Sequence, residues 1–279
     1  MNSVLFALVA SLLYGGADFL GGLATRRDEW LRVTIYAELV GLVPLALVTP
    51  IVWPHQPTLV SLGWGAAAGI VGAAGIALLY RGLGMGAMSV VAPITAVCAT
   101  VIPVLAGLAL GEHPSGRAFV GIAIAVLAIV LVSQGSHGSG KGTTSGVGMA
   151  LASGVSIGGF LILIARAHGN GLWPLLVSRL AATSVLIVLA LAQRGTLMPP
   201  RALRSTVAWC GCFDAAATVC YALAVHPGAL GVVATLISLY PATTIVLARV
   251  VLSEHLRRRQ AVGLAFAAGA VVLITGGAG

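Results

Sequence analysis

Charged side chains are scarce in this sequence. They account for 8% of its 279 residues, whereas 59% of the residues are hydrophobic. Soluble domains carry about 25% charged residues on average, so the shortage excludes an ordinary soluble protein and indicates a chain that crosses a membrane many times. The net charge of +8 comes from 15 basic and 7 acidic residues. We attribute this excess to basic cytoplasmic loops, and we expect no nucleic-acid partner.

The residues needed for common enzyme chemistry are also missing or scattered. No phosphate-binding loop is present, which excludes the usual architecture for ATP hydrolysis. The histidines lie mostly at loop positions, and no Ser/His/Asp set is recognisable. We therefore expect neither enzyme activity nor a cofactor. Four cysteines lie within apolar runs and are interpreted as packing residues, not as a disulfide set or metal ligands: Cys98, Cys210, Cys212 and Cys220.

What the sequence does contain is a long internal repeat. The stretch AMSVVAPITAVCATVIPVLAGLALGEH, Ala87 to His113, returns as ALGVVATLISLYPATTIVLARVVLSEH, Ala229 to His255, at a constant offset of 142 residues. Each copy is an apolar run that contains proline and ends in Glu-His. A repeat of this kind decides how the rest of the chain is interpreted.

Ten apolar spans can be counted around this repeat. They are expected at about 3–23, 31–52, 60–80, 87–110, 118–133, 147–165, 173–192, 205–224, 230–252 and 260–276. A Gly/Ser/Thr-rich segment predicts a flexible linker, residues 134–146, between a first five-helix repeat (1–133) and a second (147–279). Because five is odd, the second repeat is expected to be inverted, which is typical of secondary transporters. The predicted fold is an all-α membrane protein with ten transmembrane helices in two inverted five-helix repeats.

Proline occurs inside the fourth and ninth spans, at Pro93, Pro103 and Pro241. Proline removes a helical hydrogen bond and frees a carbonyl, which is tolerated in a bilayer only beside protein or a water-lined cavity. We therefore predict that these two spans line a central cavity and are kinked at the prolines, as a hinge or gate. A static kink that only aids packing is the alternative.

Both copies end in a Glu-His pair, Glu112-His113 and Glu254-His255. In inverted repeats the two pairs lie at opposite faces of the membrane, so a shared metal site is not expected. The expected role of each carboxylate is to cap the helix that follows it.

These features resemble the drug/metabolite transporter superfamily, in its EamA-like branch. The matching motifs are proline-containing fourth and ninth spans that end in Gly111-Glu112 and Ser253-Glu254, followed by helices that carry Gly121 and Gly263. The opening YGGADFLGGLATRR also looks like bacterial members. Ser253 departs from the family's usual glycine, and the second repeat has no match to Pro93. The resemblance covers nearly the whole chain and implies an exporter or metabolite permease.

We expect a secondary transporter that moves a small metabolite or drug-like solute by alternating access, coupled to an ion or driven by exchange. The alternative is a structural or sensory membrane protein without transport activity. The expected partners are a small-molecule substrate and the lipid bilayer, and the chain is expected to be a monomer or homodimer. The expected location is the plasma membrane, as a multi-pass protein of a bacterial inner membrane.

The orientation of the termini is left open by two conflicting arguments. Basic residues favour odd-numbered loops, with eleven there and only Arg117 and Arg166 in even-numbered loops. The positive-inside rule then places both termini outside the cytoplasm. Relatives of the resembling family are usually drawn with both termini inside.

Ionisable residues inside apolar spans are costly and usually face the interior of a bundle. Glu38 is a candidate for substrate or ion binding, although Arg32 is a potential structural partner. Asp18 is a second candidate, with a helix-end interaction with Arg26 or Arg27 as the alternative. Arg249 lies one turn from the end of its span and is expected to reach the membrane surface.

Arg179 and Asp214 are expected to form the polar centre of the second repeat. They lie at depths that differ by about four residues, or about 6 Å along antiparallel helices, a distance that an arginine side chain spans. The pair is either a structural ion pair or a site where Asp214 exchanges Arg179 for a proton or a substrate amine.

Tyrosines within spans complete the set of candidates, because a hydroxyl in a helix bundle usually finds a partner: Tyr36, Tyr80, Tyr221 and Tyr240. Tyr240 adjoins Pro241 and is expected to face a cavity. Tyr80 and Tyr221 are alternatively anchors at the membrane interface.

Overall fold

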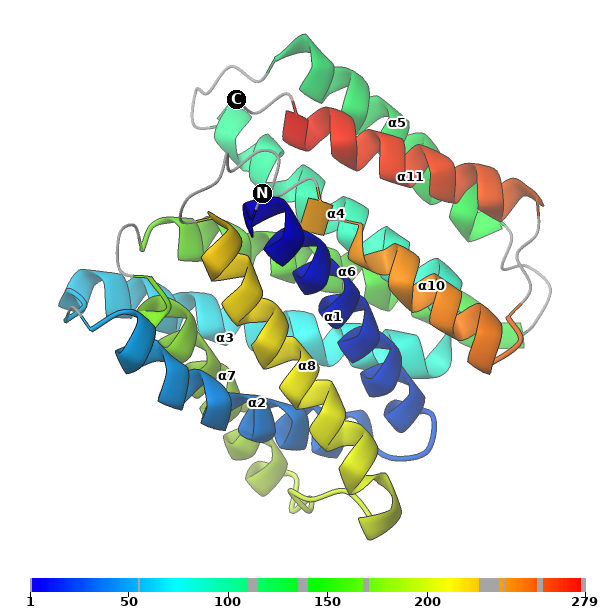
Figure 1. Ribbon diagram of the computed structural model, residues 1–279. Helices are drawn as coiled ribbons and strands as arrows, with labels where there is room; N and C mark the ends of the chain where they lie inside the picture. The colour runs from blue at the N-terminus through cyan, green and yellow to red at the C-terminus, as the bar shows by residue number, and fades with distance from the viewer. Residues whose placement is uncertain are drawn as a thin grey trace.

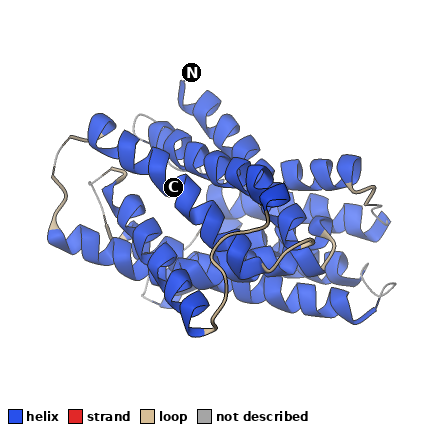
Figure 2. Ribbon diagram, turned by 90° about the horizontal axis from the view of Figure 1, so that it is seen from below, coloured by secondary structure: helices blue, strands red, loops and turns tan. Residues whose placement is uncertain are grey.

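The computed structural model describes residues 2–54, 56–109, 115–134, 140–167, 171–225, 236–237, 239–254 and 258–276. Throughout these residues the regular secondary structure is helical (Figure 2). The helices are α1 (Asn2–Thr25), α2 (Trp30–Val52), α3 (Leu59–Met85), α4 (Met88–Ala109), α5 (Gly116–Gln134), α6 (Gly140–Ala165), α7 (Trp173–Ala192), α8 (Arg201–Val225), α10 (Tyr240–Val251) and α11 (Arg258–Gly276). The all-helical prediction is confirmed for the part of the chain described.

Length and composition suit seven of the described helices for crossing a membrane, namely α1 to α4 and α6 to α8. The apolar stretches of α5 and α10, Phe119–Leu131 and Tyr240–Val251, are shorter. Large apolar side chains remain exposed along these helices, for example Leu12, Leu47 and Val188. Such a surface suits lipid, because exposed apolar patches of this extent are rare on soluble monomers.

The predicted linker is shorter than expected. α5 ends at Gln134 and α6 already begins at Gly140, so residues 140–146 are helical. Gly146 lies against Gly86, so the added turns are held by tertiary contact, which overrides the poor helix propensity of a Gly/Ser/Thr-rich run. Residues 135–139 of the linker lie outside the described part of the chain.

The two halves of the chain pack through matching helix pairs. α3 packs along α6 and α7, and its counterpart α8 packs along α1 and α2. α5 and α11, the last helices of the two halves, lie side by side at one edge of the bundle (Figure 1). Reciprocal contacts of this kind are those expected when two copies of one unit meet across a two-fold axis.

The first helices of the two halves run in opposite directions. Arg26 lies just after α1, and its Nη2 donates to the carbonyl oxygen of Gly86 at 3.2 Å. Gly86 in turn lies against Gly146, near the start of α6. α1 therefore ends at the side of the bundle where α6 begins.

Contacts between loops occur at both ends of the bundle and involve different loops at each end. At the end where α2 begins, Arg32 Nη1 donates to Thr196 Oγ1 at 3.2 Å. At the end where α2 finishes, Trp173 Nε1 donates to the carbonyl oxygen of Trp53 at 2.9 Å. Odd-numbered and even-numbered connections thus meet at different ends, as they must in an up-and-down bundle.

Glycines along α3 allow its neighbours to approach closely. A Cβ atom on Gly65 or Gly69 would collide with the backbone of Pro174 or Ser178 on α7. Close backbone approach at small residues is the usual way that helices associate in lipid. Gly65 and Gly69 are therefore helix-packing residues.

The prolines behave differently in α4 and α10. α4 runs as one helix through Pro93 and Pro103. Pro241 occupies the first turn of α10, which begins at Tyr240 with Leu239 as its N-cap residue. A proline in the first turn breaks no hydrogen bond of its own helix, and the kink expected near Pro241 stays a prediction. Residues 230–235 and 238 of the predicted ninth span lie outside the described part.

Candidate functional site

Three charged side chains from both halves of the chain meet inside the bundle. Arg179 on α7 contacts Oδ2 of Asp214 on α8 through Nη2. Its Nε lies 3.4 Å from Oε2 of Glu38 on α2. The side chains of Arg179, Glu38 and Asp214 are 11%, 13% and 22% exposed. We call these three residues the Arg179 cluster; it has one positive and two negative groups.

The pairing of Arg179 with Asp214 was predicted from sequence and is confirmed. The participation of Glu38 in the same cluster was not anticipated. Arg32, the expected partner of Glu38, instead lies 2.8 Å from Asp28 and 3.5 Å from Glu29. α2 packs against both α7 and α8, which places Glu38 in the interface between the halves.

Two glycines that sequence reasoning missed make room for the Arg179 cluster. A Cβ on Gly41 would collide with Arg179 Nη1 and would lie 2.8 Å from the carbonyl oxygen of Gly211. A Cβ on Gly211 would collide with the carbonyl oxygen of Ala37. The signal was present in the sequence, because Gly41 lies one turn after Glu38 and Gly211 one turn before Asp214.

A chain of hydrogen bonds links the Arg179 cluster to α1. Thr218 Oγ1 donates to the carbonyl oxygen of Asp214 at 2.9 Å. The Tyr14 hydroxyl lies 3.2 Å from Thr218 Oγ1 and donates to it, because the threonine proton is already used. Tyr14 was not among the candidate site residues predicted from sequence.

A second polar group surrounds Asp18 on α1, which is buried at 8% exposure. The Tyr80 hydroxyl on α3 lies 3.0 Å from the sulfur of Cys210 on α8, and the Cys210 thiol donates to the carbonyl oxygen of Ala17 at 3.3 Å. Tyr80 is 3% exposed, so it is a buried residue and not an interface anchor. Tyr240 on α10 lies close by, since its carbonyl oxygen packs against Gly15, one turn before Asp18.

The alternative interpretation of Asp18, a helix-end contact with Arg26 or Arg27, is not found among the described residues, where Arg26 binds Glu254 instead. Arg26 Nη2 lies 2.8 Å from Glu254 Oε1. The same carboxylate accepts from the backbone N–H groups of Met88 and Ser89, both at 3.1 Å, and from Ser89 Oγ at 2.8 Å. Glu254 therefore caps a helix as predicted, but the helix is α4 of the other half and not α11.

Glu112, His113 and His255 lie outside the described part of the chain. No group of three metal-binding side chains occurs among the described residues. The remaining two tyrosines are half-buried in apolar surroundings: Tyr36 packs on the central core, and Tyr221 packs beside Ala7 and Ala224.

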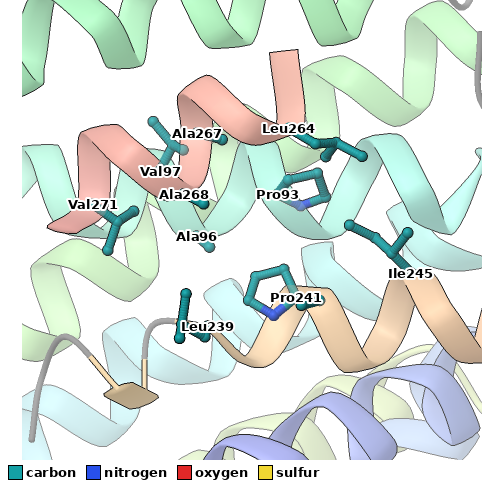
Figure 3. A pocket seen from close by; sticks show the side chains of 11 residues that line it. Pro93, Ala96, Val97, Leu239, Pro241, Ile245, Leu264, Ala267, Ala268 and Val271 are labelled. Atoms are coloured by element: carbon teal, nitrogen blue, oxygen red, sulfur yellow. The ribbon is translucent and has the colours of Figure 1, made fainter. Parts of the chain in front are cut away.

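A cavity of about 110 Å³ lies between α4, α10 and α11 (Figure 3). Pro93 and Pro241 both line it, together with apolar residues such as Val97, Leu264 and Val271. Pro103 is not part of the lining, and the expectation that the fourth and ninth spans line a central cavity stays a prediction. The third wall, α11, was not predicted, and neither the Arg179 cluster nor Asp18 lines this cavity.

A comparison with protein families assigns both halves of the chain. Residues 1–134 and 144–276 match the EamA-like transporter family. The chain belongs to this family. The EamA match in two parts agrees with the internal repeat, and it places the chain in a family of membrane transporters.

One solved structure resembles this EamA-like chain in its fold. It is described only as "Crystal structure of protein", and it shares 15% sequence identity with this EamA-like chain. The alignment covers 97% of this chain and 95% of the other, with a TM-score of 0.66. This likeness concerns the fold alone. None of the curated proteins matches the chain.

Proposed function

We propose that this EamA-like protein is a secondary transporter whose central polar site is the Arg179 cluster. The observation that carries the proposal is the meeting of Glu38 from the first repeat with Arg179 and Asp214 from the second, inside apolar helices. Charges within membrane spans are costly and usually mark substrate or ion pathways. A site between two repeats is where alternating access places a substrate.

The charges of the Arg179 cluster favour a solute with a cationic group. Two carboxylates face one guanidinium, so an amine can replace Arg179 beside Asp214 without leaving an unpaired charge. Arg179 Nη1 has no hydrogen-bond acceptor among the residues described. This donor is available to an acceptor atom of the same solute.

The proposed topology is ten spans in two inverted repeats, in the plasma membrane of a bacterium. Its support is the opposed direction of α1 and α6 and the reciprocal packing of α3 on α6 and α8 on α1. In this arrangement the halves rock against each other around the Arg179 cluster, and α4 and α10 move beside the cavity lined by Pro93 and Pro241.

Transport by purified protein in liposomes tests this function. Radiolabelled amino acids, sugars and quaternary ammonium drugs serve as probes, and we expect saturable uptake of at least one cationic solute. Asp214→Asn should abolish uptake, while the matched change Asp28→Asn, at a loop ion pair, should leave it intact. Absence of uptake for the whole panel favours a structural or sensory role. Normal uptake by Asp214→Asn shows that the Arg179 cluster is structural only.

A further inference from the structure

Asp18 differs from the other acidic residues of the chain. The sequence has 7 of them, and the structure describes six, since Glu112 lies outside the described residues. Glu38, Asp214, Asp28, Glu29 and Glu254 each form an ion pair with an arginine. Asp18 forms none, and its Oδ2 atom is buried without a hydrogen-bond partner among the described residues.

The position of Asp18 on α1 is fixed by glycines one turn away on either side. Gly15 lies against α10, where a Cβ would collide with the carbonyl oxygen of Tyr240 and contact Thr243. Gly21 lies against α3, where a Cβ would come within 2.6 Å of the Tyr80 ring. Asp18 is therefore enclosed where α1 is most tightly packed against its neighbours.

The titratable groups that face Asp18 come from three of the five helices packed against α1. The Cys210 thiol on α8 donates to the carbonyl oxygen of Ala17 next to Asp18, the Tyr80 ring on α3 lies against Gly21, and Tyr240 on α10 lies against Gly15. On α2, Glu38 is paired with Arg179, and no ion pair joins Asp18 to a described residue of α2 or α4. An ionised carboxylate without a cation is very costly in such surroundings, which favours the neutral acid.

α10, which packs on α1 one turn before Asp18, borders a cavity on its other side. One face of α10 holds α1, where Thr244 Oγ1 donates to the carbonyl oxygen of Gly15 at 3.0 Å. The opposite face, with Pro241 and Ile245, borders the cavity of about 110 Å³ shared with α4 and α11 (Figure 3). A shift of α10 into this cavity would break the contact with Gly15, one turn before Asp18.

We propose that Asp18 is the proton-binding group of this transporter, enclosed when α10 packs on α1 and open to water when α10 moves into the cavity. The carboxylate takes one proton from hydronium at one face and becomes a neutral acid. It returns that proton to water after the opposite face opens. This role rests on the proposed transport function and adds its driving ion, at a site separate from the Arg179 cluster.

Infrared spectroscopy tests the proton site without any transported solute. The protein is placed in lipid nanodiscs, and difference spectra are recorded between acidic and alkaline buffer. We expect a carbonyl-stretch band of a protonated carboxyl group that is absent in Asp18→Asn, present in Asp28→Asn and shifted in Asp18→Glu. A difference spectrum for folded Asp18→Asn that equals the wild-type spectrum overturns the proposal. If Asp18→Asn does not fold, an unshifted band in Asp18→Glu overturns it instead.

Transport in liposomes distinguishes proton coupling from movement of the solute itself. With a solute found in the panel, Asp18→Asn should lose accumulation driven by a pH gradient but keep counterflow at equal pH on both sides. Accumulation that still responds to the pH gradient in Asp18→Asn overturns the proposal. If the wild type moves no solute at all, the transport function fails by itself, and the infrared result decides the proton site independently.

Discussion

Glu254 and Asp18 show two ways in which this chain shields a carboxylate from solvent. Glu254, at the end of α10, is surrounded by donors: the Arg26 guanidinium, two backbone N–H groups and the Ser89 hydroxyl. Asp18, in the interior of α1, has a buried oxygen without a partner among the described residues. Both lie between the two halves of the chain, yet only Glu254 is satisfied as an anion.

This difference distinguishes carboxylates that stabilise the structure from carboxylates that can exchange an ion-pair partner or a proton. A carboxylate with several charge-assisted hydrogen bonds is fixed in charge and position. The Arg179 cluster is intermediate, because its ion pairs are complete in charge while Arg179 Nη1 still lacks an acceptor in the described part. A structural role therefore suits Glu254, an exchange site suits Asp214, and a proton site suits Asp18. The following variants test this order.

The largest loss of stability is expected for Arg179→Ala. Removing the guanidinium leaves Glu38 and Asp214 as facing carboxylates, and breaking a buried ion pair from one side costs about 3–5 kcal/mol. Arg249→Ala is the matched control, since Arg249 is exposed in the last turn of α10. Unfolding free energies in mixed micelles measure both. Equal losses for the two variants would show that Arg179 contributes only as a surface charge.

The prediction of the Arg179–Asp214 pair from sequence succeeded because both residues lie on neighbouring spans of one half. The position of a residue along a helix axis follows from residue counting, so the similar depths of Arg179 and Asp214 could be predicted. The contact of Glu38 with Arg179 could not be predicted from sequence, because it depends on how α2 of one half packs against α7 and α8 of the other. The same reason explains why Glu254 was assigned to the wrong helix.

The fold class was easier to predict from the sequence than the exact limits and packing of the helices. Low charge, the offset of 142 residues and short loops sufficed to predict an all-helical membrane protein with two repeats. Helix limits were less accessible, since hydropathy marks which residues tolerate lipid but not where a helix starts. The span expected at 230–252 therefore put Pro241 in mid-helix, whereas α10 begins at Tyr240.

Glu254→Ala should have the next largest effect. It removes the ion pair with Arg26 and the cap of α4, and hydrogen bonds to charged groups are worth about 1.5–3 kcal/mol. Glu29→Ala is the control, because Glu29 is 46% exposed and contacts Arg32 only at 3.5 Å, so its loss should be below about 1 kcal/mol. The same unfolding assay measures both. Equal values would remove the distinction between the satisfied carboxylate and an ordinary surface one.

Gly41→Ala tests the Arg179 cluster without changing any charge. The added methyl group would collide with Arg179 Nη1, and overpacking of this kind costs about 1–3 kcal/mol. Gly63→Ala on α3 is the control, since nothing lies within 4 Å of its Cβ position. We expect Gly41→Ala to lower both the unfolding free energy and solute uptake. Full uptake at reduced stability would mean that Arg179 can move aside without loss of function.

The smallest effect on stability is expected for Asp18→Asn, although its effect on pH-driven transport should be complete. Asparagine has nearly the shape of a neutral carboxylic acid, so replacing an acid that is already protonated should change the unfolding free energy by less than about 1 kcal/mol. The same substitution at Asp214 removes the charged partner of Arg179 and should cost about 1.5–3 kcal/mol. Both variants are unfolded in mixed micelles at neutral pH. If Asp18→Asn is as destabilising as Asp214→Asn, Asp18 is an anion with a cation beside it, and the contrast with Glu254 no longer holds.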